Sequence, residues 1–96
     1  MNLNHLYVDK LCARLQCWDA EIRRWNDQAA TAAAGDQPRL AQQLQSVSEK
    51  RDLVQDCLLQ LRSASSTAWH IVKTGMEAAW FDLTQAIEQT ALIFDT

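Results

Sequence analysis

A regular series of apolar residues runs through the first third of the chain. Alternating steps of three and four residues connect its members, which are Val8, Leu11, Leu15, Trp18, Ile22, Trp25, Ala29 and Ala32. On an α-helix this spacing places all of them on one side, and a mean step of 3.5 residues is typical of a coiled-coil seam. Because a stripe of this length needs an apolar partner, the spacing predicts a second helix packed along the first.

A second series with the same spacing occupies the middle third of the chain. Its members are Leu40, Leu44, Val47, Arg51, Val54, Leu58 and Leu61. Between the two series, Gly35 suits the C-terminus of a helix, Asp36 can cap the next helix, and Pro38 fits its first turn. Since so short a connection makes two helices antiparallel neighbours, the chain is predicted to double back at Gly35.

Folding the chain at Gly35 brings the two series together layer by layer. Small residues of the first series then face leucines of the second, and tryptophans face valines, as interdigitated packing requires. The residues expected to set this register are Trp18, Ile22, Trp25, Arg51 and Val54. Arg51 is the polar member, and its guanidinium is expected to reach Glu21 or to lie over Trp18 or Trp25. The alternative for Arg51 is a functional contact with an anion.

The last third of the chain has a different apolar period. The pair Ala68-Trp69 recurs as Ala79-Trp80 eleven residues later, a period that keeps apolar residues on one side of a nearly straight helix. The resulting stripe contains Trp69, Val72, Met76, Ala79, Trp80, Leu83, Ala86, Ile87, Ala91 and Phe94. Gly75 costs helix stability relative to alanine, and its presence predicts the close approach of a neighbouring helix.

A run of serines and threonine separates the second series from this last segment. Such residues compete with the helix by bonding to nearby backbone, and they favour helix caps. The run therefore predicts a turn, with Ser65 or Ser66 capping a third helix. The alternative is that the second and third helices are continuous.

These patterns predict a single all-α domain over residues 1–96. Helices at about 3–34 and 37–62 form an antiparallel coiled-coil hairpin, and a third amphipathic helix at about 66–94 packs along it as an elongated three-helix bundle. Only two glycines and one proline interrupt the chain, in keeping with long helices and few connections.

Composition and motifs exclude several classes of function. The net charge is −3 and no basic run occurs, so nucleic-acid binding is not expected. His5 and His70 are far apart, without a second metal ligand at helical spacing, and neither a phosphate-binding loop nor a nucleophile elbow is found. The chain is predicted not to be an enzyme and to need no cofactor or metal. Three cysteines and no export signal predict a cytoplasmic location.

Parts of the sequence resemble a family of small bacterial coiled-coil hairpin proteins described as stress-response-like. The similar residues are Tyr7, Leu11, Leu15, Trp18–Ile22, Leu44, Lys50, Arg51, Leu61, Ala68, Trp69, Gly75, Ala79, Trp80, Leu83 and Ala86. The resemblance implies an all-helical bacterial protein without catalytic residues. The chain departs from the family in its three cysteines and in Trp25 and Phe81, which leaves room for a partner of its own.

The aromatic residues allow two interpretations. In the first, the tryptophans form the core. In the second, the last helix does not dock on the hairpin and exposes an interaction surface made of Trp69, Met76, Trp80, Phe81, Leu83, Ile87 and Phe94.

The predicted function is that of a non-catalytic helical interaction protein, related to stress, which binds a protein partner or a second copy of itself. One alternative is a peripheral membrane protein that lays residues 68–94 on a lipid surface. Charge disfavours it, because Lys73 is the segment's one Lys or Arg against Glu77, Asp82 and Glu88, with Asp95 directly after it. Another alternative is a thiol sensor that uses Cys12, Cys17 or Cys57.

Overall fold

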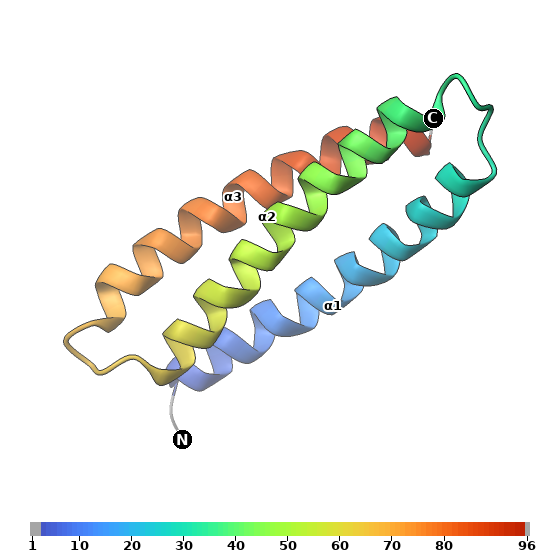
Figure 1. Cartoon of the computed structure of the whole chain (residues 1–96). Helices are drawn as coiled ribbons and strands as arrows, with labels where there is room; N and C mark the ends of the chain where they lie inside the picture. Colours follow the sequence, from blue (N-terminus) through green and yellow to red (C-terminus); the bar gives the residue numbers. More distant parts are fainter. Residues whose placement is uncertain (1–2, 96) are drawn as a thin grey trace.

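The computed structural model describes residues 3–95, which form three long helices (Figure 1). Helix α1 spans Leu3–Ala30, α2 spans Gln37–Ser63 and α3 spans Trp69–Phe94. Figure 1 shows α2 antiparallel to both α1 and α3, in an elongated bundle that measures 51 × 21 × 18 Å. The all-α three-helix bundle is therefore confirmed for the described residues. Positions 1, 2 and 96 of the predicted domain lie outside them.

The first helix ends earlier than predicted, at Ala30 rather than at residue 34. Its last carbonyl groups find partners in both backbone and side chains: Thr31 N and Ala32 N donate to Gln28 O and Ala29 O, both at 3.2 Å, and Gln37 Nε2 donates to Ala30 O at 3.4 Å. Thr31 Oγ1 also donates to Gln28 O, at 3.1 Å. Gly35 was expected at the C-terminus of this helix, but α1 ends five residues before it and the φ of Gly35 is not positive. Backbone and side-chain donors, not a left-handed glycine, satisfy the end of α1.

The start of α2 follows the prediction only in part. Pro38 lies in its first turn, where the missing N–H costs nothing. Asp36 occupies the N-cap position, but its side chain makes no capping hydrogen bond. The predicted carboxylate cap is therefore not formed.

The connection between α2 and α3 is a turn, so the continuous-helix alternative was wrong. Ala64 is extended, with φ −70° and ψ 142°, which stops α2. Ser65 stabilises the turn before α3: its Oγ accepts a hydrogen bond from Ala68 N at 3.2 Å, and its carbonyl accepts one from Trp69 N at 2.9 Å. The N-cap position of α3 is Ala68, however, so the predicted serine cap is not at the helix start. The helix itself begins at Trp69, three residues later than expected.

Small and polar side chains join α2 to α3. Thr90 is fully buried on α3 and its Oγ1 accepts a hydrogen bond from Gln43 Nε2 of α2 at 2.9 Å. Ala79 and Ala86 are buried on the same side of α3 as Thr90. Their small volume lets the two helices approach closely. Gly75 does not serve this purpose, because a Cβ added there would meet nothing within 4 Å.

Aromatic side chains join α1 to α3. Three ring pairs span the two helices: Tyr7–Trp69 at 6.2 Å, Trp18–Trp80 at 4.8 Å and Trp25–Phe94 at 6.1 Å between centroids. Such offset and edge-on pairs add stability beyond the area that they bury. The structure therefore supports the interpretation in which the tryptophans form the core.

Candidate functional site

The structure corrects the predicted interaction surface. Four of its seven residues, Trp69, Met76, Leu83 and Ile87, are buried in the core. Trp80 and Phe94 are half-buried against aromatic rings of α1. Only Phe81 is exposed. The physical reason is that α3 docks on the hairpin, so its wide apolar stripe faces the rest of the chain.

A different apolar stripe lies on the opposite side of α3. Ile71 is 77% exposed, Phe81 60% and Leu92 67%, and Ala78 between them is also exposed. Steps of seven, three and eleven residues separate these four positions, so all lie on one side of the helix. We call these four residues the outer face of α3. At about 1.5 Å per residue the face is roughly 30 Å long.

Sequence reasoning included Phe81 but missed Ile71 and Leu92. The signal was present, since Ile71 and Ala78 are a heptad apart and Phe81 and Leu92 share the eleven-residue period. It was overlooked because the stripe centred on Leu83 has the same period and more members. Both stripes are apolar, so the pattern alone could not say which side would be covered.

Charge is distributed unevenly along α3. Its N-terminal part carries His70 and Lys73, and Lys73 Nζ lies 3.7 Å from Glu77 Oε1. Its C-terminal part carries Asp82 and Glu88, both exposed, without a Lys or Arg. In the N-terminal part the charge of Lys73 is thus balanced by Glu77, whereas the C-terminal part is acidic.

Four of the five predicted register residues are buried at the centre of the bundle: Trp18, Ile22, Trp25 and Val54. Arg51 also lies between α1 and α2, but its partner differs from those expected. Its Nε and Nη2 donate to Asp19 Oδ1 and Oδ2, both at 2.7 Å. These hydrogen bonds raise the pKa of Arg51. Its charge is thus neutralised within the chain, which disfavours the anion-binding alternative.

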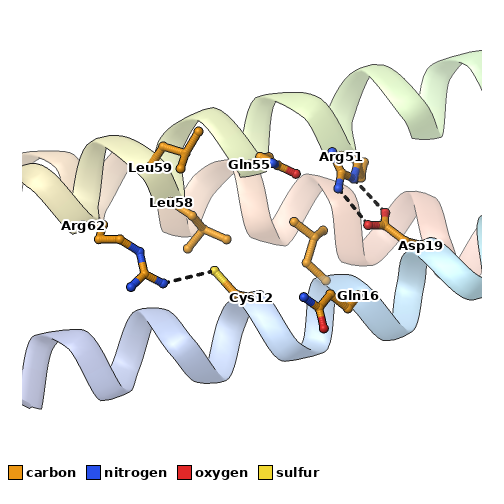
Figure 2. A pocket seen from close by; sticks show the side chains of 9 residues that line it. Cys12, Gln16, Asp19, Arg51, Gln55, Leu58, Leu59 and Arg62 are labelled. Carbon is orange, nitrogen blue, oxygen red and sulfur yellow. Dashed lines mark hydrogen bonds and ion pairs between the residues drawn. The ribbon is translucent and has the colours of Figure 1, made fainter.

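A groove of about 270 Å³ runs between α1 and α2 (Figure 2). It is lined by Cys12, Leu15, Gln16, Asp19, Arg51, Gln55, Leu58, Leu59 and Arg62. Figure 2 shows the Arg51–Asp19 pair at one end and Arg62 beside Cys12 at the other, where Nη2 and Sγ are 3.8 Å apart. Arg62 also donates to Asp9 at 2.9 Å.

The chemistry of this groove is limited. Both of its guanidinium groups have a carboxylate partner, so neither is left to attract an anionic ligand. No histidine is among the described residues that line the groove, and so Cys12 has no imidazole nearby to act as a general base. The groove therefore lacks the nucleophile–base pair that covalent catalysis uses.

A second groove, of about 380 Å³, lies between α1 and α3. Its lining residues are Tyr7, Leu11, Met76, Glu77, Trp80, Phe81 and Thr84. Burial, and then the negative charge of Glu77, raise the pKa of Tyr7. Phe81 belongs both to this lining and to the outer face of α3, so the two apolar surfaces are continuous.

The three cysteines are free thiols in different surroundings. Cys12 and Cys57 are half-buried and pack against the core, while Cys17 is exposed. Among residues 3–95, no three His, Cys, Asp or Glu side chains are grouped so that they could hold a metal ion.

No helix within the described part of the chain has the length and apolar character needed to cross a membrane. Comparisons of the chain with models of protein families, with curated proteins and with solved structures found no match. The interpretation of function therefore depends on the surfaces described above.

Proposed function

We propose that this protein is a non-catalytic helical interaction protein that binds a protein partner or a second copy through the outer face of α3. The observation that carries the proposal is the exposure of Ile71, Phe81 and Leu92 on one side of a single helix. Removing a large apolar side chain from water contributes about 1.5–3 kcal/mol, so a partner that covered all three would gain appreciably. Exposed apolar groups gathered in this way mark interaction sites.

Helix α2 provides an internal comparison. The outer side of α2 carries Gln45, Glu49, Asp52 and Asp56, all of them exposed. Its exposed Leu53 and Leu59 are six positions apart and project in different directions. Single exposed leucines are ordinary, whereas Ile71, Phe81 and Leu92 share one side of α3, with polar residues such as Thr74 and Gln85 between them.

A protein partner suits this surface better than a lipid bilayer does. Lys73 is the one Lys or Arg in α3, which also contains Glu77, Asp82 and Glu88. Amphipathic helices that lie on membranes usually carry basic residues on the polar side, because the lipid headgroups include anions. An acidic helix would be repelled.

The proposed setting is the bacterial cytoplasm, in keeping with three free thiols, and the sequence resemblance suggests a role in stress. Both parts of this setting belong to the proposal.

Photocrosslinking in cells tests the proposal. A photoreactive phenylalanine analogue at Phe81 is expected to give one discrete crosslinked product, and the same analogue at Ile71 is expected to give the same product. Ala20 serves as the matched control, because it is exposed on α1, away from the outer face of α3. Absence of a product at both α3 positions, or equal crosslinking at Ala20, would contradict the proposal.

A further inference from the structure

We infer that the outer face of α3 is covered by the same face of a second copy, with the two α3 helices antiparallel and a two-fold axis beside Phe81. This inference rests on the proposed function and names the partner. A two-fold interface must be complementary to itself, since each surface patch meets its own copy. Self-complementarity about the two-fold axis must hold both for the apolar residues of α3 and for its charged residues.

The three large apolar residues of the outer face are spaced almost symmetrically about Phe81. Ile71 precedes Phe81 by ten residues and Leu92 follows it by eleven, which corresponds to about 15 and 16.5 Å along the helix. When two such helices cross antiparallel at Phe81, Ile71 of each copy lies opposite Leu92 of the other. The two phenylalanines meet at the centre, where an aromatic pair is favourable.

Charge selects the antiparallel arrangement over the parallel one. Lys73 lies eight residues before Phe81 and Glu88 seven after it, so the antiparallel crossing places Lys73 of each copy opposite Glu88 of the other. When a two-fold axis relates two antiparallel helices, each flank of one helix lies beside the same flank of the other. Lys73 and Glu88 both lie toward one flank of α3, so they can meet across the axis. A parallel pair would bring the two acidic halves to the same level, where like charges repel.

The size of the interface predicts a weak dimer. A helix of 26 residues is about 39 Å long, and a contact strip about 10 Å wide covers roughly 400 Å² of each copy. The total of roughly 800 Å² is below the ~1,200–2,000 Å² of stable complexes. Association is therefore expected to depend on concentration, with a Kd of about 10–100 µM.

Disulfide trapping of the full chain distinguishes the arrangements. In a background where Cys12, Cys17 and Cys57 are replaced by alanine or serine, the variant Phe81→Cys is expected to form a covalent dimer with itself. A mixture of Ile71→Cys and Leu92→Cys is expected to give the mixed dimer in preference to either homodimer. Preferential Ile71–Ile71 and Leu92–Leu92 products would indicate a parallel pair and overturn the inference.

Charge reversal gives a second, reversible test by sedimentation equilibrium. Lys73→Glu creates two repulsive contacts per dimer and is expected to raise the Kd about tenfold. Adding Glu88→Lys to the same chain restores both attractive contacts and is expected to bring the Kd back. A double variant that associates no better than Lys73→Glu would contradict the pairing of these residues.

The inference and the proposed function fail in different ways. If the purified chain stays monomeric up to about 1 mM, well above the expected Kd, the second copy is excluded. The proposed function would survive that result if Phe81 still crosslinked to a different protein in cells, and would fail with it if no crosslink formed. Co-sedimentation of the chain with phosphatidylcholine–phosphatidylglycerol vesicles, without dimer formation, would also overturn the inference.

Discussion

The Arg51–Asp19 ion pair is predicted to couple α1 and α2 energetically, and a double-mutant cycle measures that coupling. Both side chains are only about a quarter exposed, at 26% and 28%, and two hydrogen bonds of 2.7 Å join them. Exposed ion pairs contribute about 0.2–1 kcal/mol, and hydrogen bonds to charged groups about 1.5–3 kcal/mol. The bidentate, partly buried Arg51–Asp19 pair is therefore expected to have a coupling free energy of about 1–2 kcal/mol.

The cycle uses Arg51→Met, Asp19→Ala and the double variant. Methionine keeps an unbranched apolar chain about as long as the aliphatic stem of arginine, so the change removes the guanidinium and preserves most of the packing. Urea unfolding followed by tryptophan fluorescence gives the free energy of unfolding of each variant. The coupling is the difference between the effect of the double variant and the sum of the single effects.

A matched control lies at the same helix interface. Arg62 and Asp9 also connect α2 to α1, but they are 43% and 59% exposed and share one hydrogen bond of 2.9 Å. Their coupling is expected to be smaller and to fall further in 1 M salt, because exposed charges are screened more strongly. If the Arg51–Asp19 coupling were no larger than the control value, the reasoning from burial and geometry would be refuted.

Four further changes have defined outcomes. Trp25→Ala should lower the free energy of unfolding by about 3–5 kcal/mol in a urea titration, because Trp25 is only 1% exposed. Gly75→Ala should raise it by about 0.5–1 kcal/mol, since the added Cβ meets open space in the middle of α3. Phe81→Ser should change the stability of the monomer, measured at low protein concentration, by less than about 0.5 kcal/mol, as the ring is 60% exposed. Asp95→Asn should lower the Tm at pH 7, because Arg24 holds the pKa of Asp95 below its ordinary value of 3.8. A lowered pKa in the folded state stabilises the fold above pH 3.8, so the Tm difference should vanish as the pH falls through the lower folded-state pKa.

The helices could be predicted from the sequence because their burial is periodic. Leu15 belongs to the apolar series of α1, and Val54 and Leu58 belong to the series of α2. Both series have coiled-coil spacing, and all three residues are buried. The turn at Ser65 was also readable, since a hydrogen bond between a serine side chain and nearby backbone is a local interaction between residues close in the chain.

The end of α1 could not be predicted in the same way. Beside local backbone hydrogen bonds, it involves Gln37, which reaches back from the start of α2 to the carbonyl groups of Ala30 and Ala32. That contact exists only once the chain has doubled back. Glycine is the usual local signal for a helix end, and here a side chain from the next helix takes its place.

The partner of Arg51 illustrates a finer limit of sequence reasoning. The heptad pattern placed Arg51 at the α1–α2 seam, which the structure bears out. The choice between Asp19 and Glu21 depends on how the two helices are rotated, and a difference of two residues on a helix is a turn of about 200°. Periodicity shows which side of each helix is buried, but it does not give the rotation of the helix about its axis accurately enough to choose between Asp19 and Glu21.

The arrangement of the bundle explains why the large exposed residues Ile71, Phe81 and Leu92 share one side of α3. Helix α2 lies close to α3 through alanines, whereas aromatic pairs such as Trp18–Trp80 span the distance between α1 and α3. These contacts use one side of α3 and leave Ile71 and Phe81 on the other, on a helix that the core holds in place. A rigid helix has little conformational entropy to lose on binding. Even a contact of roughly 800 Å² can then be specific, because the helix presents its side chains in a fixed order and spacing.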